Sequence, residues 1–173
     1  MKFIIILLLL IPSVHAWDYD GHKLIIDYVY FSTDMQFKNF NLSKLEEGSI
    51  APDKIFRDQR KHHYPFTYNL TNRWLNNDSD VSYSFGVASH YISDSFVSPH
   101  YIKNENYKDH QIFEAQANFI NIDCKDYNYN LNYLSAGPKN SKYWNIWLRS
   151  RNDNIPLAQI EQSTKVVLSI AID

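Results

Sequence analysis

Histidine and carboxylate side chains are concentrated between residues 90 and 114, at spacings that suit a metal site. His90 and Asp94 are four residues apart, as are His110 and Glu114, so each pair lies on one face of a helix. His100 lies between the two pairs. Imidazole nitrogen and carboxylate oxygen are the ligands that Zn²⁺ takes where thiolates are scarce, and the chain has a single Cys. The segment therefore predicts a zinc site.

Further histidines and a carboxylate precede this segment. Asp53 ends the sequence Gly-Ser-Ile-Ala-Pro-Asp, which predicts a turn that presents a carboxylate. His62 and His63 follow it, and His22 lies near the N-terminus. One His–carboxylate pair alone is more often a hydrogen-bonded structural feature. Every His after residue 16 nevertheless belongs to one of these clusters, and this distribution favours a metal site over scattered structural histidines.

The first sixteen residues are typical of a secretory signal peptide. A lysine precedes the apolar run 3–11, and Val14 and Ala16 occupy the −3 and −1 positions of a small-residue cleavage site. The run is shorter than the about 20 residues that span a bilayer, so we expect no transmembrane segment. Cleavage would yield a secreted, extracellular chain that begins at Trp17.

The remainder of the chain is predicted to be all-α. Apolar residues recur at helical spacing, and no segment shows the sustained alternation of a strand. We expect loops at 48–53 and 128–141. We expect helices at 22–36, 40–47, 68–76, 82–97, 107–122, 144–149 and 157–172. One compact multi-helix domain over residues 17–173, with a metal cluster held between helices, fits this length.

Composition excludes several classes of protein. A single Cys excludes a disulfide-rich scaffold and a zinc site built from several thiolates. Lys and Arg number 17 against 19 Asp and Glu, and loss of Lys2 with the signal peptide makes the balance more acidic. We therefore expect no stable nucleic-acid partner.

Taken in order, these residues resemble the zinc-dependent phospholipase C family and its relatives, the three-zinc single-strand nucleases. In that superfamily the mature chain begins with Trp, whose amino group and carbonyl oxygen chelate a zinc. The signal-peptide pattern places Trp17 at this position. The family's further motif residues are matched here by His22, Asp53, His62 or His63, His90, Asp94, His100, His110 and Glu114.

The resemblance implies up to three zinc ions per chain. The first would be held by Asp53, one of His62 and His63, His90 and Asp94. The second would be held by His100, His110 and Glu114. The third would be held by Trp17, His22 and a bridging Asp94. The phospholipase pattern His-Phe-Tyr favours His62, since Tyr64 then aligns, and His63 remains an alternative.

The function implied is phosphodiester hydrolysis by a zinc-bound hydroxide, with Asp53 also a candidate to orient the attacking water. Glu114 is phospholipase-like at its position, which favours phospholipid head groups at a membrane surface as substrate. The short spacing from Trp17 to His22 is instead like that of the nucleases. A three-zinc nuclease or other phosphodiesterase, and a secreted zinc-binding domain without turnover, are the alternatives.

Overall fold

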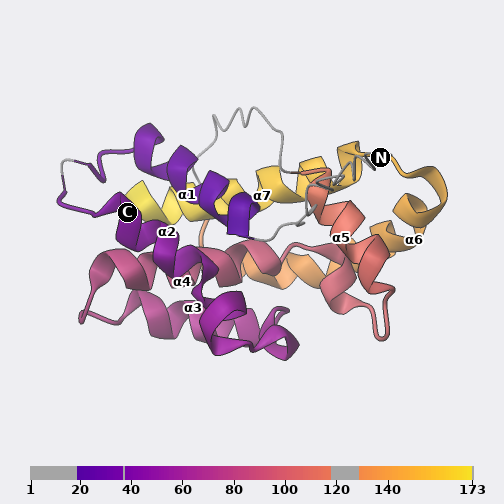
Figure 1. The fold of residues 1–173 in the computed structure, drawn as a ribbon, viewed down its shortest axis with the longest axis horizontal. Helices are drawn as coiled ribbons and strands as arrows, with labels where there is room; N and C mark the ends of the chain where they lie inside the picture. The colour runs from indigo at the N-terminus through magenta and orange to yellow at the C-terminus, as the bar shows by residue number, and fades with distance from the viewer. Residues whose placement is uncertain (1–18, 37, 118–128, 173) are drawn as a thin grey trace, which may run out of the picture.

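Helices make up the regular structure of the described residues. The computed structural model describes residues 19–36, 38–117 and 129–172, and this part of the chain contains seven α-helices and no strand. The all-α prediction is confirmed. The helices are α1 (Tyr19–Ser32), α2 (Leu42–Ala51), α3 (Phe66–Leu75), α4 (Val81–Asp94), α5 (Tyr107–Ala115), α6 (Ser141–Ser150) and α7 (Asn154–Ile172) (Figure 1).

The predicted signal peptide, Trp17 and residues 118–122 of the predicted fifth helix lie outside the described residues. The signal peptide and the N-terminal zinc chelate therefore stay predictions. No described helix combines the length and apolar character needed to cross a bilayer.

α4 is the central helix, and it is buried along almost its whole length. Asp80 caps its N-terminus by accepting a hydrogen bond from the Tyr83 amide (3.0 Å). The helix packs on α2 and α3 and also contacts α1 and α7. In Figure 1 the indigo helix α1 and the yellow helix α7 run past each other on one side of α4 and α3 lies on the other, while α2 packs against both α1 and α4.

Two glycines allow α2 and α4 to approach closely. A Cβ added to Gly86 would collide with the Leu45 carbonyl oxygen, and one added to Gly48 would collide with the Tyr83 carbonyl oxygen. The backbones therefore touch where any side chain would separate them. This contact fixes α4, which carries His90 and Asp94, against α2, which is followed directly by the turn that carries Asp53.

The main core joins the outer helices to this centre. Phe113 of α5 packs edge-on against Trp147 of α6, with ring centroids 5.1 Å apart, and Trp144 stacks on Trp147. Phe113 and Trp147 are fully buried, and burial of such a side chain contributes about 1.5–3 kcal/mol. The contact anchors α5, which carries His110 and Glu114.

The predicted loop at 48–53 is wrong. α2 continues to Ala51, and a π-helical turn, η1 (Pro52–Phe56), follows it directly. A glycine at position 48 is typical of a helix break, whereas here it permits the close contact with α4. Proline is compatible with the first turn of a helix, where its missing N–H is not needed, so Pro52 does not end the helical segment.

Much of the predicted loop at 128–141 is also helical. η4 (Leu131–Asn140) has the tighter 3₁₀ geometry, and the Asn130 side chain caps it by accepting a hydrogen bond from the Asn132 amide (3.0 Å). A search for 3.6-residue periodicity does not detect a helix with three residues per turn. Two other short 3₁₀ turns are η2 (Gln59–Lys61) and η3 (Ser98–Tyr101).

Candidate metal centre

Potential metal ligands from several elements converge at the C-terminal end of α4. His22 comes from α1, Asp53 from η1 and His100 from η3, while His62 directly follows η2. In the described part of the chain, the donor atoms form three groups whose atoms lie within 4.8 Å of one another. These are His22, Asp53 and His90; His62, His90 and Asp94; and His100, His110 and Glu114.

Asp94 is the carboxylate of the second group, and it also approaches His22 of the first. Its Oδ2 lies 2.9 Å from His90 Nε2 and 2.8 Å from His62 Nδ1, and its Oδ1 lies 3.5 Å from His22 Nε2. The His22 and His90 rings stack with centroids 3.8 Å apart. Asp53 approaches from the solvent side, with its Oδ1 3.5 Å from His62 Nδ1 and its side chain 26% exposed.

The third group lies beside this cluster. The helical spacing of α5 brings His110 Nε2 to 2.8 Å from Glu114 Oε1, and His100 Nε2 lies 3.6 Å from the same oxygen. The His62 and His100 ring centroids are 5.9 Å apart, so the groups adjoin. Glu114 is buried, and its two histidines are only slightly exposed.

Two atoms of this cluster are well placed to bind a cation. His90 Nε2 and Asp94 Oδ2 are fully buried and 2.9 Å apart, but no well-aligned hydrogen bond joins them. A buried polar atom without a partner costs about 1–3 kcal/mol. A cation that accepts both lone pairs removes that cost. With neutral imidazoles and carboxylates as donors, the set fits Zn²⁺.

The five imidazoles of the cluster share one arrangement, in which one ring nitrogen faces the cluster and the other is bonded behind it. Such outer bonds orient a metal-binding histidine and increase its basicity. The outer partners are Ser93 Oγ for His22 Nδ1 (2.9 Å), Asp58 Oδ1 for His62 Nε2 (3.0 Å), Ser49 O for His90 Nδ1 (2.7 Å), Asp94 O for His100 Nδ1 (3.1 Å) and Glu105 Oε1 for His110 Nδ1 (3.1 Å).

These bonds fix which nitrogen can bind a metal. The carbonyl oxygens of Ser49 and Asp94 can only accept, so His90 and His100 donate through Nδ1 and keep Nε2 for a metal. Ser93 Oγ donates to the His90 carbonyl (2.8 Å) and therefore accepts from His22 Nδ1. His22 Nε2 is then directed at Asp94.

Burial and the charges of neighbouring residues shift the pKa values of the side chains in the cluster. Burial would raise the pKa of Asp94, but the surrounding imidazoles, first among them His90, hold that pKa well below its ordinary value. Burial would lower the pKa of His62, but Asp94 and Asp58 outweigh it and raise that pKa to about 10. Glu114 likewise outweighs burial and raises the pKa of His110 to about 9. Burial lowers the pKa of His100 to about 4.

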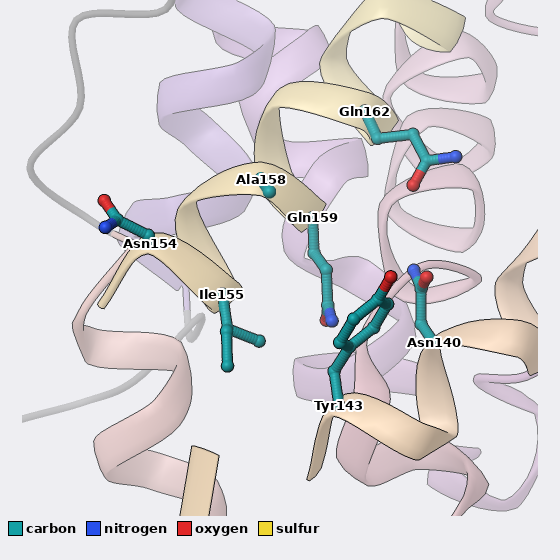
Figure 2. Close-up of a pocket in the computed structure, with 7 residues that line it drawn as sticks. All are labelled: Asn140, Tyr143, Asn154, Ile155, Ala158, Gln159 and Gln162. Atoms are coloured by element: carbon teal, nitrogen blue, oxygen red, sulfur yellow. The ribbon is translucent and has the colours of Figure 1, made fainter. Parts of the chain in front are cut away.

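Buried amides support the segment that carries His100. Gln159 of α7 accepts a hydrogen bond from the Ser98 amide (2.9 Å) and donates one to Ser98 Oγ (2.5 Å), and Ser98 Oγ donates to the Asn140 carbonyl (2.7 Å). Figure 2 shows Gln159 and Asn140 beside Tyr143 at a cavity of about 300 Å³ between α7 and the start of α6. The cavity is lined by none of the candidate metal ligands.

Most of the residues expected to bind metal lie together, and two do not join a described group. His62 is buried within the cluster. His63 is half-buried and packs its ring against Phe66 and Tyr101, with centroids 5.3 and 6.0 Å away. Trp17 lies outside the described residues. These placements favour His62 over His63 as the ligand.

Two carboxylates that bond the outer ring nitrogens of metal-site histidines were not predicted from the sequence. Asp58 bonds His62 Nε2 and also accepts a hydrogen bond from the Tyr91 hydroxyl (3.0 Å). Glu105 bonds His110 from the residue before the α5 cap, Asn106. The one available signal was the four-residue spacing of Asp58 and His62, which matches that of the pairs on helices.

Comparison with known proteins assigns the chain to a family. No curated protein and no solved structure matches the chain significantly. A family model described as zinc-dependent phospholipase C matches residues 21–172, which includes every described candidate ligand. The chain therefore belongs to the zinc-dependent phospholipase C family.

Proposed function

We propose that the protein is a secreted zinc-dependent phosphodiester hydrolase of the phospholipase C type. The observation that carries the proposal is the convergence of five imidazoles and three carboxylates in adjoining groups, with His90 Nε2 and Asp94 Oδ2 fully buried among them. Family membership supplies the substrate class, a phospholipid. The signal-peptide pattern of residues 1–16 supports secretion.

We infer that the chain binds up to three zinc ions. Asp53, His62, His90 and Asp94 would hold the first, and His100, His110 and Glu114 the second. Trp17, His22 and Asp94 would hold the third. The nearness of these donor atoms supports the first two sets, and the approach of His22 to Asp94 supports the described part of the third.

The residues around the cluster suit hydrolysis of a phosphodiester. When bound, zinc lowers the pKa of a water ligand to about 7 and neutralises the charge of the phosphate and its leaving oxygen. Asp53 is the most exposed carboxylate of the cluster, so it can contact both the site and incoming solvent. Burial raises the pKa of Asp53, and its carboxylate would accept a proton from water and orient it for attack.

The outer hydrogen bonds keep the donor atoms in place during turnover. His90 is held by a backbone carbonyl at the close contact of α2 and α4, and His100 by the carbonyl at the end of α4. A carbonyl oxygen can only accept a hydrogen bond, so each of these histidines keeps a proton on Nδ1. In the neutral ring Nε2 then carries no proton. This arrangement maintains the ligands in the form that binds a metal.

The experiment is an assay of the mature protein, beginning at Trp17, on three substrates with zinc counted in the same sample. We expect turnover of phosphatidylcholine, with little turnover of single-stranded DNA or bis-nitrophenyl phosphate. Preferential cleavage of DNA would instead indicate a nuclease. Full zinc occupancy without turnover of any substrate would refute the enzyme proposal and indicate a zinc-binding domain.

A further inference from the structure

The segment between α2 and α3 exposes apolar side chains next to the metal centre. Ile55 and Phe56 are 57% and 36% exposed, although they lie only two and three residues after the candidate ligand Asp53. Phe56 stacks on Trp74 of α3, with ring centroids 5.6 Å apart and planes 8° from parallel. The stacking holds Phe56 in place at the surface.

The same segment concentrates positive charge. Residues 54–61 contain Lys54, Arg57, Arg60 and Lys61, all of them exposed. These are four of the chain's 17 Lys and Arg residues, where an even distribution would place about one, and the whole chain has a net charge of −2. The one acidic residue, Asp58, bonds His62 and Tyr91, and its Oδ2 also lies 3.8 Å from Lys61 Nζ.

The backbone of the segment has an unusual conformation. Arg57 ends the π-helical turn with φ 52°, in the left-handed region that costs most residues about 1–2 kcal/mol. Strained, non-glycine positions of this kind concentrate at functional sites. Here the turn at Arg57 separates the exposed Ile55 and Phe56 from the exposed Arg60 and keeps all of them in one short stretch between two candidate ligands.

We propose that residues 54–61, with Phe56 braced on Trp74, form a surface that docks on an anionic phospholipid bilayer. Apolar side chains enter the boundary between head groups and acyl chains, and the surrounding cations pair with anionic head groups. Because Asp53 and His62 flank the segment, docking brings lipid phosphates to the metal centre. The claim that docking delivers substrate rests on the proposed function, whereas binding of this surface to a bilayer can be measured without turnover.

The charge part is tested by vesicle co-sedimentation of the zinc-loaded protein. The vesicles contain either phosphatidylcholine alone or phosphatidylcholine with about 30% phosphatidylserine. Each basic residue at an anionic surface strengthens binding about fivefold, so the double variant Arg57→Asn/Arg60→Gln should bind the mixed vesicles about 30-fold more weakly. The matched control is Lys139→Gln/Arg149→Gln, which removes the same charge at exposed positions elsewhere and should stay within about twofold of the wild type. Equal losses in the two variants, or no loss in the first, would overturn the proposal.

The apolar part is tested with single substitutions of matched exposure. Ile55→Ser should weaken binding to both kinds of vesicle by about threefold to tenfold, since it removes an apolar group that enters the bilayer. Ile146→Ser on α6, where Ile146 is 51% exposed, should bind as the wild type does. Equal binding by the two variants would contradict insertion at this segment.

Two further measurements separate this proposal from others. If Arg57→Asn/Arg60→Gln loses binding to a fluorescent single-stranded oligonucleotide and keeps vesicle binding, the surface binds nucleic acid and the proposal is overturned. Turnover of a short-chain phosphatidylcholine dissolved as monomers tests the hydrolase function alone. Soluble turnover with no change in vesicle binding refutes only the docking surface, whereas vesicle binding without soluble turnover refutes only the hydrolase.

Discussion

Asp58 provides the sharpest test of how the protein tunes its metal centre. Its carboxylate accepts a hydrogen bond from His62 Nε2 at 3.0 Å while His62 Nδ1 faces Asp94 at 2.8 Å. Asp58→Asn keeps an oxygen for the first bond and removes only the negative charge. The imidazole then loses basicity but remains oriented, so the zinc bound by His62 should be held 10–100-fold more weakly, or by about 1.4–2.8 kcal/mol.

The pH dependence of this loss distinguishes tuning from a structural defect. In the metal-free protein, the pKa of His62 is raised to about 10, with Asp58 one of the causes, so zinc must displace a proton from it at neutral pH. Asp58→Asn lowers that pKa and reduces the competition from protons. The loss in zinc affinity should therefore be small near pH 7 and grow toward pH 9.

The assay is competition with a chromophoric chelator at several pH values. Tyr91→Phe is the control, because it removes only the hydroxyl that donates to the other Asp58 oxygen and should change zinc affinity by less than about threefold. Wild-type affinity of Asp58→Asn at pH 9, or a deficit that is the same at every pH, would refute the reasoning.

Other perturbations have equally definite outcomes. Zinc binding should release protons between pH 6 and 8, because the raised pKa values of His62 and His110 keep both side chains protonated in the metal-free protein. Calorimetry in two buffers of different ionisation enthalpy measures this release, and an equal heat of binding in both buffers would contradict it. One extra residue before Trp17 should reduce zinc content by one ion per chain, measured by elemental analysis, and an unchanged content would exclude the N-terminal chelate. Gly86→Ala should destabilise the fold by about 1–3 kcal/mol, since its Cβ meets the Leu45 carbonyl, and calorimetric melting that is unchanged would count against the close helix contact.

Much of the candidate site could be predicted because its residues are four apart on helices. His90 with Asp94 and His110 with Glu114 are adjacent on α4 and α5 for the reason that the spacing indicates. Likewise, periodic apolar residues located the seven described α-helices, although α5 ends at Ala115 and the helix predicted there continues to 122. These features depend on local geometry, which the sequence expresses directly.

Features that depend on contacts between distant segments were not predictable. Gly48 is read as a break in a helix until the facing backbone of α4 is known. The bond from His90 to the Ser49 carbonyl joins residues 41 positions apart and leaves no mark in the spacing of side chains. The choice between His62 and His63 also needed the fold, since adjacent residues differ only in which one the η2 turn directs inward.

The central claim is that this cluster binds zinc and that the bound metal hydrolyses phospholipid. The most direct measurement follows phosphatidylcholine hydrolysis by the mature protein before chelation, after complete removal of metal, and after zinc is restored. The account predicts up to three zinc ions per chain, loss of activity with the metal and recovery with zinc. Undiminished hydrolysis by metal-free protein, or no hydrolysis by the fully zinc-loaded protein, would contradict it.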